Sequence, residues 1–291
     1  MKKYLKLIRV KHWLKNGLVF LPIFFSINIF NTKYFLTTLI AFFIFSLTSS
    51  IVYVINDIND IEKDKNHPVK KNRPLASGEI SIKNAYITIL VISLLTITMI
   101  TLTYLTNKNY GVAIIPVVYL VLNLLYSKWL KHVPIIDVVI LVSGFLFRVM
   151  YGGVVNNIAV SKWLYLMIIF GSFYLGFGKR RNEIIKNGEK SRKVLELYNK
   201  DFLDKNMYVS LALAVVSYTL WCVDPITIAR IGNDYLFWTV PLVLVILQLY
   251  SLNIEKDSHG DPIEVVLGDK VLIGTIALYI IIMGGVLYLL W

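Results

Sequence analysis

A short polar stretch inside an otherwise apolar region carries the most distinctive chemistry of this sequence. It runs Tyr53-Val-Ile-Asn-Asp-Ile-Asn-Asp-Ile-Glu-Lys-Asp64 and contains the pattern Asn56-Asp57-x-x-Asp60-x-Glu62-x-Asp64. In a helix, the asparagine at 56 and the aspartates at 57, 60 and 64 fall within an arc of about 100° on one face, whereas Glu62 points elsewhere. Carboxylates that share a face repel each other, so we expect a cation to join them.

The predicted cation is Mg²⁺, because hard oxygen ligands favour it and because it accepts a substrate phosphate as a further ligand. The alternative is a solvated acidic patch that the adjacent lysines neutralise. The position at the end of an apolar segment favours the metal. The predicted metal ligands are Asn56, Asp57, Asp60 and Asp64, and we expect Asp57 and Asp60 to be essential for catalysis.

Apolar segments of membrane-spanning length must position this face. Of the 291 residues 57% are hydrophobic and 16% are charged, and the mean hydropathy is +0.66, whereas soluble domains carry about 25% charged residues. A spanning helix needs about 20 mostly apolar residues. Nine candidate spans meet this need, at about 14–30, 35–55, 84–105, 110–126, 135–155, 163–178, 207–223, 235–252 and 271–290. The sequence therefore predicts an all-α integral membrane protein, and the unbroken apolar runs exclude a β-barrel.

The formal net charge of +12 would suggest nucleic-acid binding in a soluble protein. In a membrane protein, the distribution of the Lys and Arg residues instead indicates on which side of the membrane each loop lies. Of the 30 Lys and Arg residues, 25 lie on one side of the nine spans and four on the other, and Arg148 lies inside the membrane. The positive-inside rule makes the 25-charge side cytoplasmic. The N-terminus is then cytoplasmic and Trp291 lies outside. The only cysteine, Cys222, excludes an intrachain disulfide, and the four histidines lack metal-ligand spacing.

Several polar clusters end the inward-running spans. The aspartate cluster ends the second span, Tyr126–Lys128 the fourth and Lys179–Glu183 the sixth, and Asp261–Glu264 follow the eighth. All of them therefore fall on the predicted cytoplasmic face, where a soluble anionic sugar diphosphate would be met.

The aspartate pattern, together with Asn72-Arg73-Pro74-Leu75-Ala-Ser77-Gly78, resembles the UbiA-type prenyltransferase superfamily. The resemblance implies a single nine-helix domain over 1–291, with a central cavity open to the cytoplasmic side. It also implies that the aspartate face binds Mg²⁺ and a diphosphate, and that Arg73 helps to hold the phosphates.

Most of that superfamily carries a second aspartate motif at the cytoplasmic end of the sixth span. This chain has Lys179-Arg180-Arg181-Asn182-Glu183 there, preceded by Tyr174. In this respect the chain resembles the decaprenyl-phosphate phosphoribosyltransferases. The matching stretches are Arg9-Val-Lys11-His-Trp13-Leu-Lys15-Asn16, Leu125–Asp137, Ser143–Arg148, Ser161–Leu164, Gly178–Glu183 and Gly260-Asp261-Pro262-x-Glu264.

This resemblance implies transfer of 5-phosphoribose from phosphoribosyl pyrophosphate to a polyprenyl phosphate, for the synthesis of cell-envelope glycan precursors at the plasma membrane. The 5-phosphate of the donor and the phosphate of the lipid need cations, which Lys179, Arg180 or Arg181 could supply. The alternative role of these three residues is positive-inside anchoring. The substrate-binding residues expected in full are Lys15, Asn16, Arg73, Tyr126, Lys128, Asp137, Arg148, Tyr174, Lys179, Arg180 and Glu183.

Four of these residues have competing interpretations. Arg148 lies well inside the fifth span, where it would line a polar cavity or form a polar tie between helices. Asp137 lies eleven residues earlier and could instead cap its helix or compensate the helix dipole. Lys128, like Lys15, could simply anchor the chain at the membrane interface.

Two other functions compete with phosphoribosyl transfer. The first is a prenyltransferase that moves an isoprenyl group from its diphosphate to an aromatic or quinone-precursor acceptor; the missing second aspartate motif counts against it. The second is a lipid or solute transporter without chemistry, which should place polar groups near the membrane midplane, where only Arg148 lies. The sequence leaves open the polyprenyl chain length, the pathway that uses the product and the oligomeric state.

Overall fold

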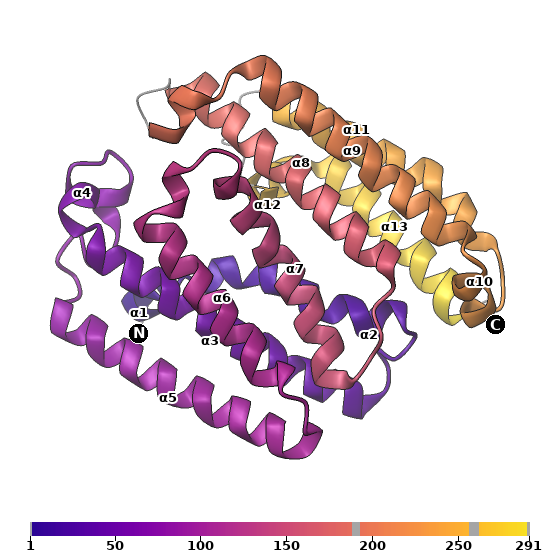
Figure 1. Ribbon diagram of the computed structural model, residues 1–291, viewed down its shortest axis with the longest axis horizontal. Coiled ribbons are helices and arrows are strands. Elements are labelled where there is room, and N and C mark those ends of the chain that lie inside the picture. Colours follow the sequence, from indigo (N-terminus) through magenta and orange to yellow (C-terminus); the bar gives the residue numbers. More distant parts are fainter. Residues whose placement is uncertain (1, 188–192, 256–261, 290–291) are drawn as a thin grey trace. The chain divides into compact units, whose positions relative to one another are not determined.

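The computed structural model describes residues 2–187, 193–255 and 262–289. Gly260 and Asp261 of the Gly260–Glu264 stretch therefore lie outside the described residues, and only the second half of that motif is placed. The described chain consists of helices joined by turns and contains no strand (Figure 1). It divides into two compact units, which are described separately: Met1–Lys128 with Phe147–Ala159, and Trp129–Leu146 with Val160–Trp291.

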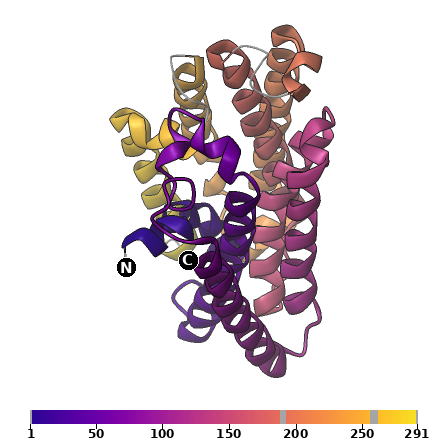
Figure 2. The same ribbon diagram turned by 90° about the vertical axis from the view of Figure 1, so that its left-hand side faces the viewer.

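The first unit is built around one long helix, α3 (Thr32–Asn59). Figures 1 and 2 show α5 running beside this helix. The unit's helical segments are α1 (Lys2–Leu7), η1 (Val10–Phe20), α2 (Leu21–Phe25), α3, α4 (Ile61–Lys65), η2 (Lys70–Asn72), α5 (Ile82–Asn107), α6 (Gly111–Lys128) and the end of α7 (Ile136–Asn156).

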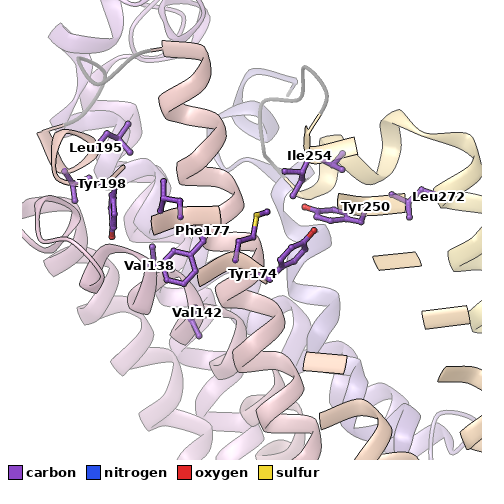
Figure 3. Close-up of a cluster of buried hydrophobic side chains, with 13 residues drawn as sticks. Val138, Val142, Tyr174, Phe177, Leu195, Tyr198, Tyr250, Ile254 and Leu272 are labelled. Carbon is purple, nitrogen blue, oxygen red and sulfur yellow. The ribbon is translucent and has the colours of Figure 1, made fainter. Parts of the chain in front are cut away.

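The second unit begins with a short 3₁₀ turn and ends with the C-terminal helix. Its segments are η3 (Leu130–His132), the start of α7, α8 (Lys162–Asn187), η5 (Lys193–Leu197), α9 (Lys200–Val223), α10 (Pro225–Ile231), η6 (Tyr235–Thr239), α11 (Val240–Glu255), α12 (Pro262–Gly268) and α13 (Lys270–Tyr288). Its core contains Val138, Phe177, Tyr198, Met207 and Leu272, together with Tyr174 and Tyr250, whose ring centroids lie 5.9 Å apart (Figure 3).

Seven helical segments of the described chain are long and apolar enough to span a membrane: Thr32–Asn59, Ile82–Asn107, Gly111–Lys128, Ile136–Asn156, Lys200–Val223, Tyr235–Glu255 and Lys270–Tyr288. The prediction of an all-α integral membrane fold is confirmed. Each of the seven corresponds to one of the nine expected spans. The total of nine spans and the central cavity stay predictions.

The two remaining expected spans take other forms. The segment predicted at 14–30 is a 3₁₀ helix, η1, followed by the five-residue helix α2. It differs from a single helix because Pro22 has no N–H to donate and occupies the first turn of α2, and because Ile27 has a left-handed backbone with φ of 62°. The span predicted at 163–178 lies within α8, a helix of 26 residues whose last turns carry Lys179–Arg181.

Small polar side chains on α3 allow the N-terminal segment to lie against this helix. The Asn16 amide donates to Ser46 Oγ at 2.9 Å, and the Trp13 indole N–H donates to Ser50 Oγ at 3.0 Å. Ser50 Oγ in turn donates to the Ile8 carbonyl at 2.8 Å. These bonds fix the register of the N-terminal segment along α3, because each buried polar group needs its partner.

A small apolar cluster holds the end of this segment beside the end of α3. Leu7 of α1 and Val54 of α3 are fully buried, and they pack with Leu75, Ile80 and Ala85. The cluster therefore brings Arg9, which lies between α1 and η1, and the Arg73 loop close to the aspartates at the end of α3.

Candidate functional site

Two carboxylates and two guanidinium groups form a compact cluster at the end of α3. Arg9 Nη2 lies 2.5 Å from Asp57 Oδ1, and Arg73 Nη1 lies 3.1 Å from the same oxygen. Arg73 Nη1 also lies 2.6 Å from Asp64 Oδ2. Both carboxylates are almost completely buried, with 2% exposure for Asp57 and 3% for Asp64. The cluster is therefore close to electrical neutrality in a region of low solvent access.

The aspartates share a face because helical hydrogen bonding continues past the end of α3. The Asp60 N–H donates to the Asn56 carbonyl at 3.0 Å, and the Asp64 N–H donates to the Asp60 carbonyl at 2.8 Å. This continuity keeps Asp57 and Asp64 two turns apart on one side, where one guanidinium reaches both of them.

Arg73 is placed by a tight loop between η2 and α5. The Ser77 N–H donates to the Arg73 carbonyl at 2.9 Å, and the loop turns at Gly78, whose φ of 78° suits glycine. Leu75 and Ile80 of this loop are buried and pack with Leu7 of α1 and Val54 of α3. Arg73 therefore lies next to the aspartate face, a position consistent with its predicted role in holding substrate phosphates.

Arg9 is the residue of the cluster to which the sequence assigned no role. It precedes η1 and has φ of 54° and ψ of 50°, a left-handed conformation that costs an ordinary residue about 1–3 kcal/mol. Its guanidinium carbon lies 4.8 Å from the centre of the Tyr53 ring, so one side chain contacts both a carboxylate and an aromatic face of α3. The only sequence signal was its place in the Arg9–Asn16 stretch.

The other two predicted metal ligands hold oxygen atoms that the arginines do not reach. Asn56 Oδ1 is buried and has no hydrogen-bond partner among the described residues. Asp60 is half-buried, and its carboxylate forms no ion pair within the described part of the chain. Such unused oxygens can accept a cation.

A complete metal cage is not assembled. Within residues 2–187, 193–255 and 262–289, no group of three or more His, Cys, Asp or Glu side chains could hold a metal ion. Mg²⁺ is usually held by one or two carboxylates together with substrate phosphates and waters, so an incomplete set suits a metal that arrives with a phosphate. The donors at 56, 57, 60 and 64 therefore fit such an ion, and their assignment stays a prediction.

Arg148 forms a buried polar tie within the first unit. Arg148 Nε donates to Asn16 Oδ1 at 2.7 Å, and its guanidinium carbon lies 5.0 Å from the Phe45 ring centre and 5.4 Å from that of Tyr119. The exposed fraction of Arg148 is 6% and that of Asn16 is 1%. These contacts match the interhelical interpretation, and the substrate roles expected for both residues stay predictions.

In the second unit, Arg180 and Asp137 form a buried ion pair. Arg180 Nε lies 2.6 Å from Asp137 Oδ2, and Arg180 Nη1 lies 2.8 Å from Glu183 Oε2. The Tyr198 hydroxyl donates to Asp137 Oδ1 at 2.7 Å. Burial raises the pKa of Tyr198, against the hydrogen bond from the Ile135 N–H, which lowers it. The structure thus brings together three predicted residues, Asp137, Arg180 and Glu183.

The other residues of this cationic stretch are placed differently. Arg181 Nε lies 2.5 Å from Asp204 Oδ1 on α9, so the positive charge of Arg181, like that of Arg180, has a carboxylate partner inside the fold. Lys179 is half-buried on α8. Tyr174 is 2% exposed, and its hydroxyl lies 2.6 Å from Ser251 Oγ.

The remaining predicted residues lie at helix ends of the first unit. Tyr126 is half-buried and Lys128 is exposed at the end of α6, and Lys15 is half-buried in η1.

Comparison with known proteins gives consistent matches along the chain. The UbiA prenyltransferase family model matches residues 19–267. The decaprenyl-phosphate phosphoribosyltransferase of Corynebacterium glutamicum is 34% identical over 278 residues, which cover 92% of this chain and 81% of that protein. The protein of the same name from Mycolicibacterium smegmatis is 33% identical over 290 residues, which cover 92% and 87%.

Solved structures show the same fold. A UbiA homologue from Archaeoglobus fulgidus bound to GPP and Mg²⁺ matches with a TM-score of 0.70 at 17% identity, covering 98% of this chain and 99% of that one. A digeranylgeranylglyceryl phosphate synthase structure matches with a TM-score of 0.66 at 22% identity, covering 99% of both chains. The extent of the family match, together with relatives above 30% identity over most of the chain, shows that this protein belongs to the UbiA prenyltransferase family.

Proposed function

We propose that this protein transfers 5-phosphoribose from phosphoribosyl pyrophosphate to a polyprenyl phosphate and releases diphosphate, supplying precursors for cell-envelope glycans. Relatives that carry the name decaprenyl-phosphate phosphoribosyltransferase match 92% of the chain at 30–34% identity, which supports this reaction.

The observation that carries the proposal is the pair of arginines at the end of α8. A prenyltransferase of the usual kind would need a second carboxylate motif at that place. Here Arg180 and Arg181 occupy it, and each is bound to carboxylates of its own unit. Within the described residues, the carboxylates of the α3 cluster are then the ones placed to serve a diphosphate, and one such face suits one diphosphate leaving group.

The leaving group would be held at the α3 cluster. Asn56, Asp57, Asp60 and Asp64 would bind Mg²⁺, which neutralises charge on a departing diphosphate. Arg73 lies within reach of two of these carboxylates, at 3.1 and 2.6 Å, so it is placed to pair with phosphate oxygens as well.

The reaction exchanges one bond to ribose for another. The bond between C1 and the diphosphate oxygen breaks, and positive charge develops at C1 and the ring oxygen. A phosphate oxygen of the lipid forms the new bond to C1 from the opposite face. The acceptor is already an anion at neutral pH, so no strong general base is required. Catalysis is then mostly positioning and charge stabilisation.

The same proposal gives the protein an orientation. We place it in the plasma membrane with the N-terminus and the α3 cluster on the cytoplasmic side and Trp291 outside. The distribution of Lys and Arg residues supports this orientation. A water-soluble sugar diphosphate would then reach the carboxylate face directly, and the lipid tail would stay in the bilayer.

The decisive experiment uses purified protein in nanodiscs with Mg²⁺, radiolabelled phosphoribosyl pyrophosphate and a polyprenyl phosphate. Labelled lipid is the expected product. If label reaches an acceptor only from an isoprenyl diphosphate, the protein is a prenyltransferase and the proposal is wrong. If neither donor is consumed, and the protein reconstituted in sealed vesicles instead makes them accumulate a lipid or solute, the protein is a transporter and both transferase hypotheses are wrong.

A further inference from the structure

A pocket of about 640 Å³ lies in the first unit beside the α3 cluster. Its walls come from α1, the start of η1 and the Arg73 loop, and its cationic residues are Lys2, Lys6, Arg9, Lys11 and Arg73. Its volume falls within the range of about 300–1,000 Å³ that is typical of small-molecule sites. None of the residues that line it is acidic.

Three of these cations lack a carboxylate partner in the part of the chain that the structure describes. Arg9 and Arg73 are bound to Asp57 and Asp64, but Lys2, Lys6 and Lys11 form no ion pair among the described residues. Lys6 Nζ donates to the Asn72 carbonyl at 2.9 Å, a contact that holds the amine at the pocket without removing its charge. Like charges at one pocket repel each other, so an anion that entered would be strongly favoured.

The pocket shares residues with the proposed diphosphate site. Arg9 and Arg73 line the pocket and also contact the buried carboxylate of Asp57. A guanidinium presents five N–H donors, so it can serve an anion in the pocket while it still faces the carboxylate. The two sites are therefore contiguous, with the two guanidinium groups between them.

The cations expected to bind phosphate at the end of α8 contrast with those of the pocket. Arg180 and Arg181 already pair with Asp137, Glu183 and Asp204. A phosphate monoester carries a charge between about −1.5 and −2 at neutral pH. The three uncompensated lysines supply the positive charge that such a group requires, and the arginines of α8 do not.

We propose that this pocket is a phosphate-monoester subsite of the same active centre. The inference rests on the proposed function, in which two reactants carry such a group: the donor has a 5-phosphate, and the acceptor is a polyprenyl monophosphate. The shared chemistry is a terminal phosphate dianion, bound by lysines and flanked by Arg9 and Arg73.

The test compares two double variants that remove equal charge. Lys2→Ala/Lys11→Ala alters the pocket, and Lys3→Ala/Lys71→Ala is the matched control. Lys3 lies in the same short helix and donates to the Glu79 carbonyl at 3.2 Å, and neither control residue lines the pocket. Both variants are reconstituted in nanodiscs of neutral phosphatidylcholine, which removes anchoring to anionic lipid.

Initial rates are measured against each substrate while the other is saturating. We expect the pocket variant to raise the KM of one substrate about tenfold or more, with kcat changed less than about twofold, and the control to match the wild type. A raised KM for phosphoribosyl pyrophosphate identifies the 5-phosphate as the occupant, and a raised KM for the polyprenyl phosphate identifies the lipid phosphate. Unchanged KM values for both substrates overturn the proposal.

A binding measurement tests the subsite independently of whether the protein catalyses phosphoribosyl transfer. Inorganic phosphate is titrated calorimetrically into wild type, the pocket variant and the control. Binding that is lost only in the pocket variant supports the subsite even if the wild type transfers no phosphoribose, in which case the proposed function alone has failed. Equal binding, or none, in all three proteins overturns the subsite.

Discussion

The Arg180 guanidinium lies 2.6 Å from the Asp137 carboxylate, and the exposed fractions of the two side chains are 1% and 0%. The pair joins α8 to the first turn of α7 within the second unit, and the Tyr198 hydroxyl and Glu183 complete its hydrogen bonds. Removal of one partner from such a pair leaves an uncompensated buried charge, which costs far more than the pair itself contributes.

Arg180→Ala should therefore lower the free energy of unfolding by about 3–5 kcal/mol. The measurement is the midpoint of thermal unfolding in detergent. Arg180→Met/Asp137→Leu, which removes both charges, should recover much of the loss. Equal instability of the single and double variants would contradict a buried pair.

The metal assignment predicts a second result. Asp60→Asn should abolish nearly all Mg²⁺-dependent turnover without a large loss of stability, because Asp60 is half-buried and forms no ion pair in the described part of the chain. Asp57→Asn should also abolish turnover. It should destabilise the protein as well, since it leaves Arg9 and Arg73 without a shared carboxylate. Activity and unfolding midpoints are measured together, and substantial turnover in either variant would contradict the assignment.

Asn56 offers a separate test of the metal. Its Oδ1 atom is buried without a hydrogen-bond partner among the described residues, so Asn56→Ala removes an unsatisfied group and should leave the unfolding midpoint nearly unchanged. If the oxygen is a metal ligand, the Mg²⁺ concentration for half-maximal activity should rise by about tenfold. Direct titration with Mn²⁺, followed by electron paramagnetic resonance, checks the affinity without turnover. An unchanged affinity would remove Asn56 from the ligand set.

A substitution of Lys179 tests whether the cations near the end of α8 bind a substrate phosphate. Lys179→Ala should raise the KM for phosphoribosyl pyrophosphate, because the amine would no longer pair with a phosphate. Lys200→Ala, which removes an exposed charge at the first position of α9, serves as the control. A donor dependence equal to that of the control would assign Lys179 to membrane anchoring.

The carboxylate face could be predicted because its spacing is local. Asp57 and Asp64 lie seven residues apart, and helical periodicity alone places them together. Arg9 could not be predicted in the same way, because it lies 48 residues from Asp57 and reaches it only after Leu7 and Trp13 fix the N-terminal segment against α3. The Arg180–Asp137 pair spans 43 residues and depends on helix packing in the same manner.

The membrane spans were predicted from the length of the apolar runs. Seven of the nine predicted spans correspond to described helices that are long and apolar enough to cross a membrane. The first differed because hydropathy does not distinguish one α-helix from a 3₁₀ helix that ends at Phe20 and is followed by a short α-helix with Pro22 in its first turn. The competing interpretations of Arg148 also needed the fold. The 2.7 Å contact with Asn16 and the packing against the Phe45 and Tyr119 rings place it in a tie between helical segments.

Tyr198 gives a prediction for alkaline pH. Burial raises its pKa, so the neutral hydroxyl is favoured in the folded state. A raised folded-state pKa contributes stability that is present below the unfolded value of about 10 and is lost as the pH rises through the folded value. The stability difference between wild type and Tyr198→Phe should therefore shrink above about pH 10. Unfolding midpoints measured from pH 7 to 11 test this, and a constant difference would contradict it.

The pairing of Arg9 and Arg73 with Asp57 and Asp64 has a consequence for assembly in the membrane. Many small metal-binding domains fold only when the ion is present, because binding of the ion supplies the free energy of folding. Here two guanidinium groups already balance two buried carboxylates. The protein can thus insert and fold without metal and substrate, and chelation should stop the chemistry while the fold persists.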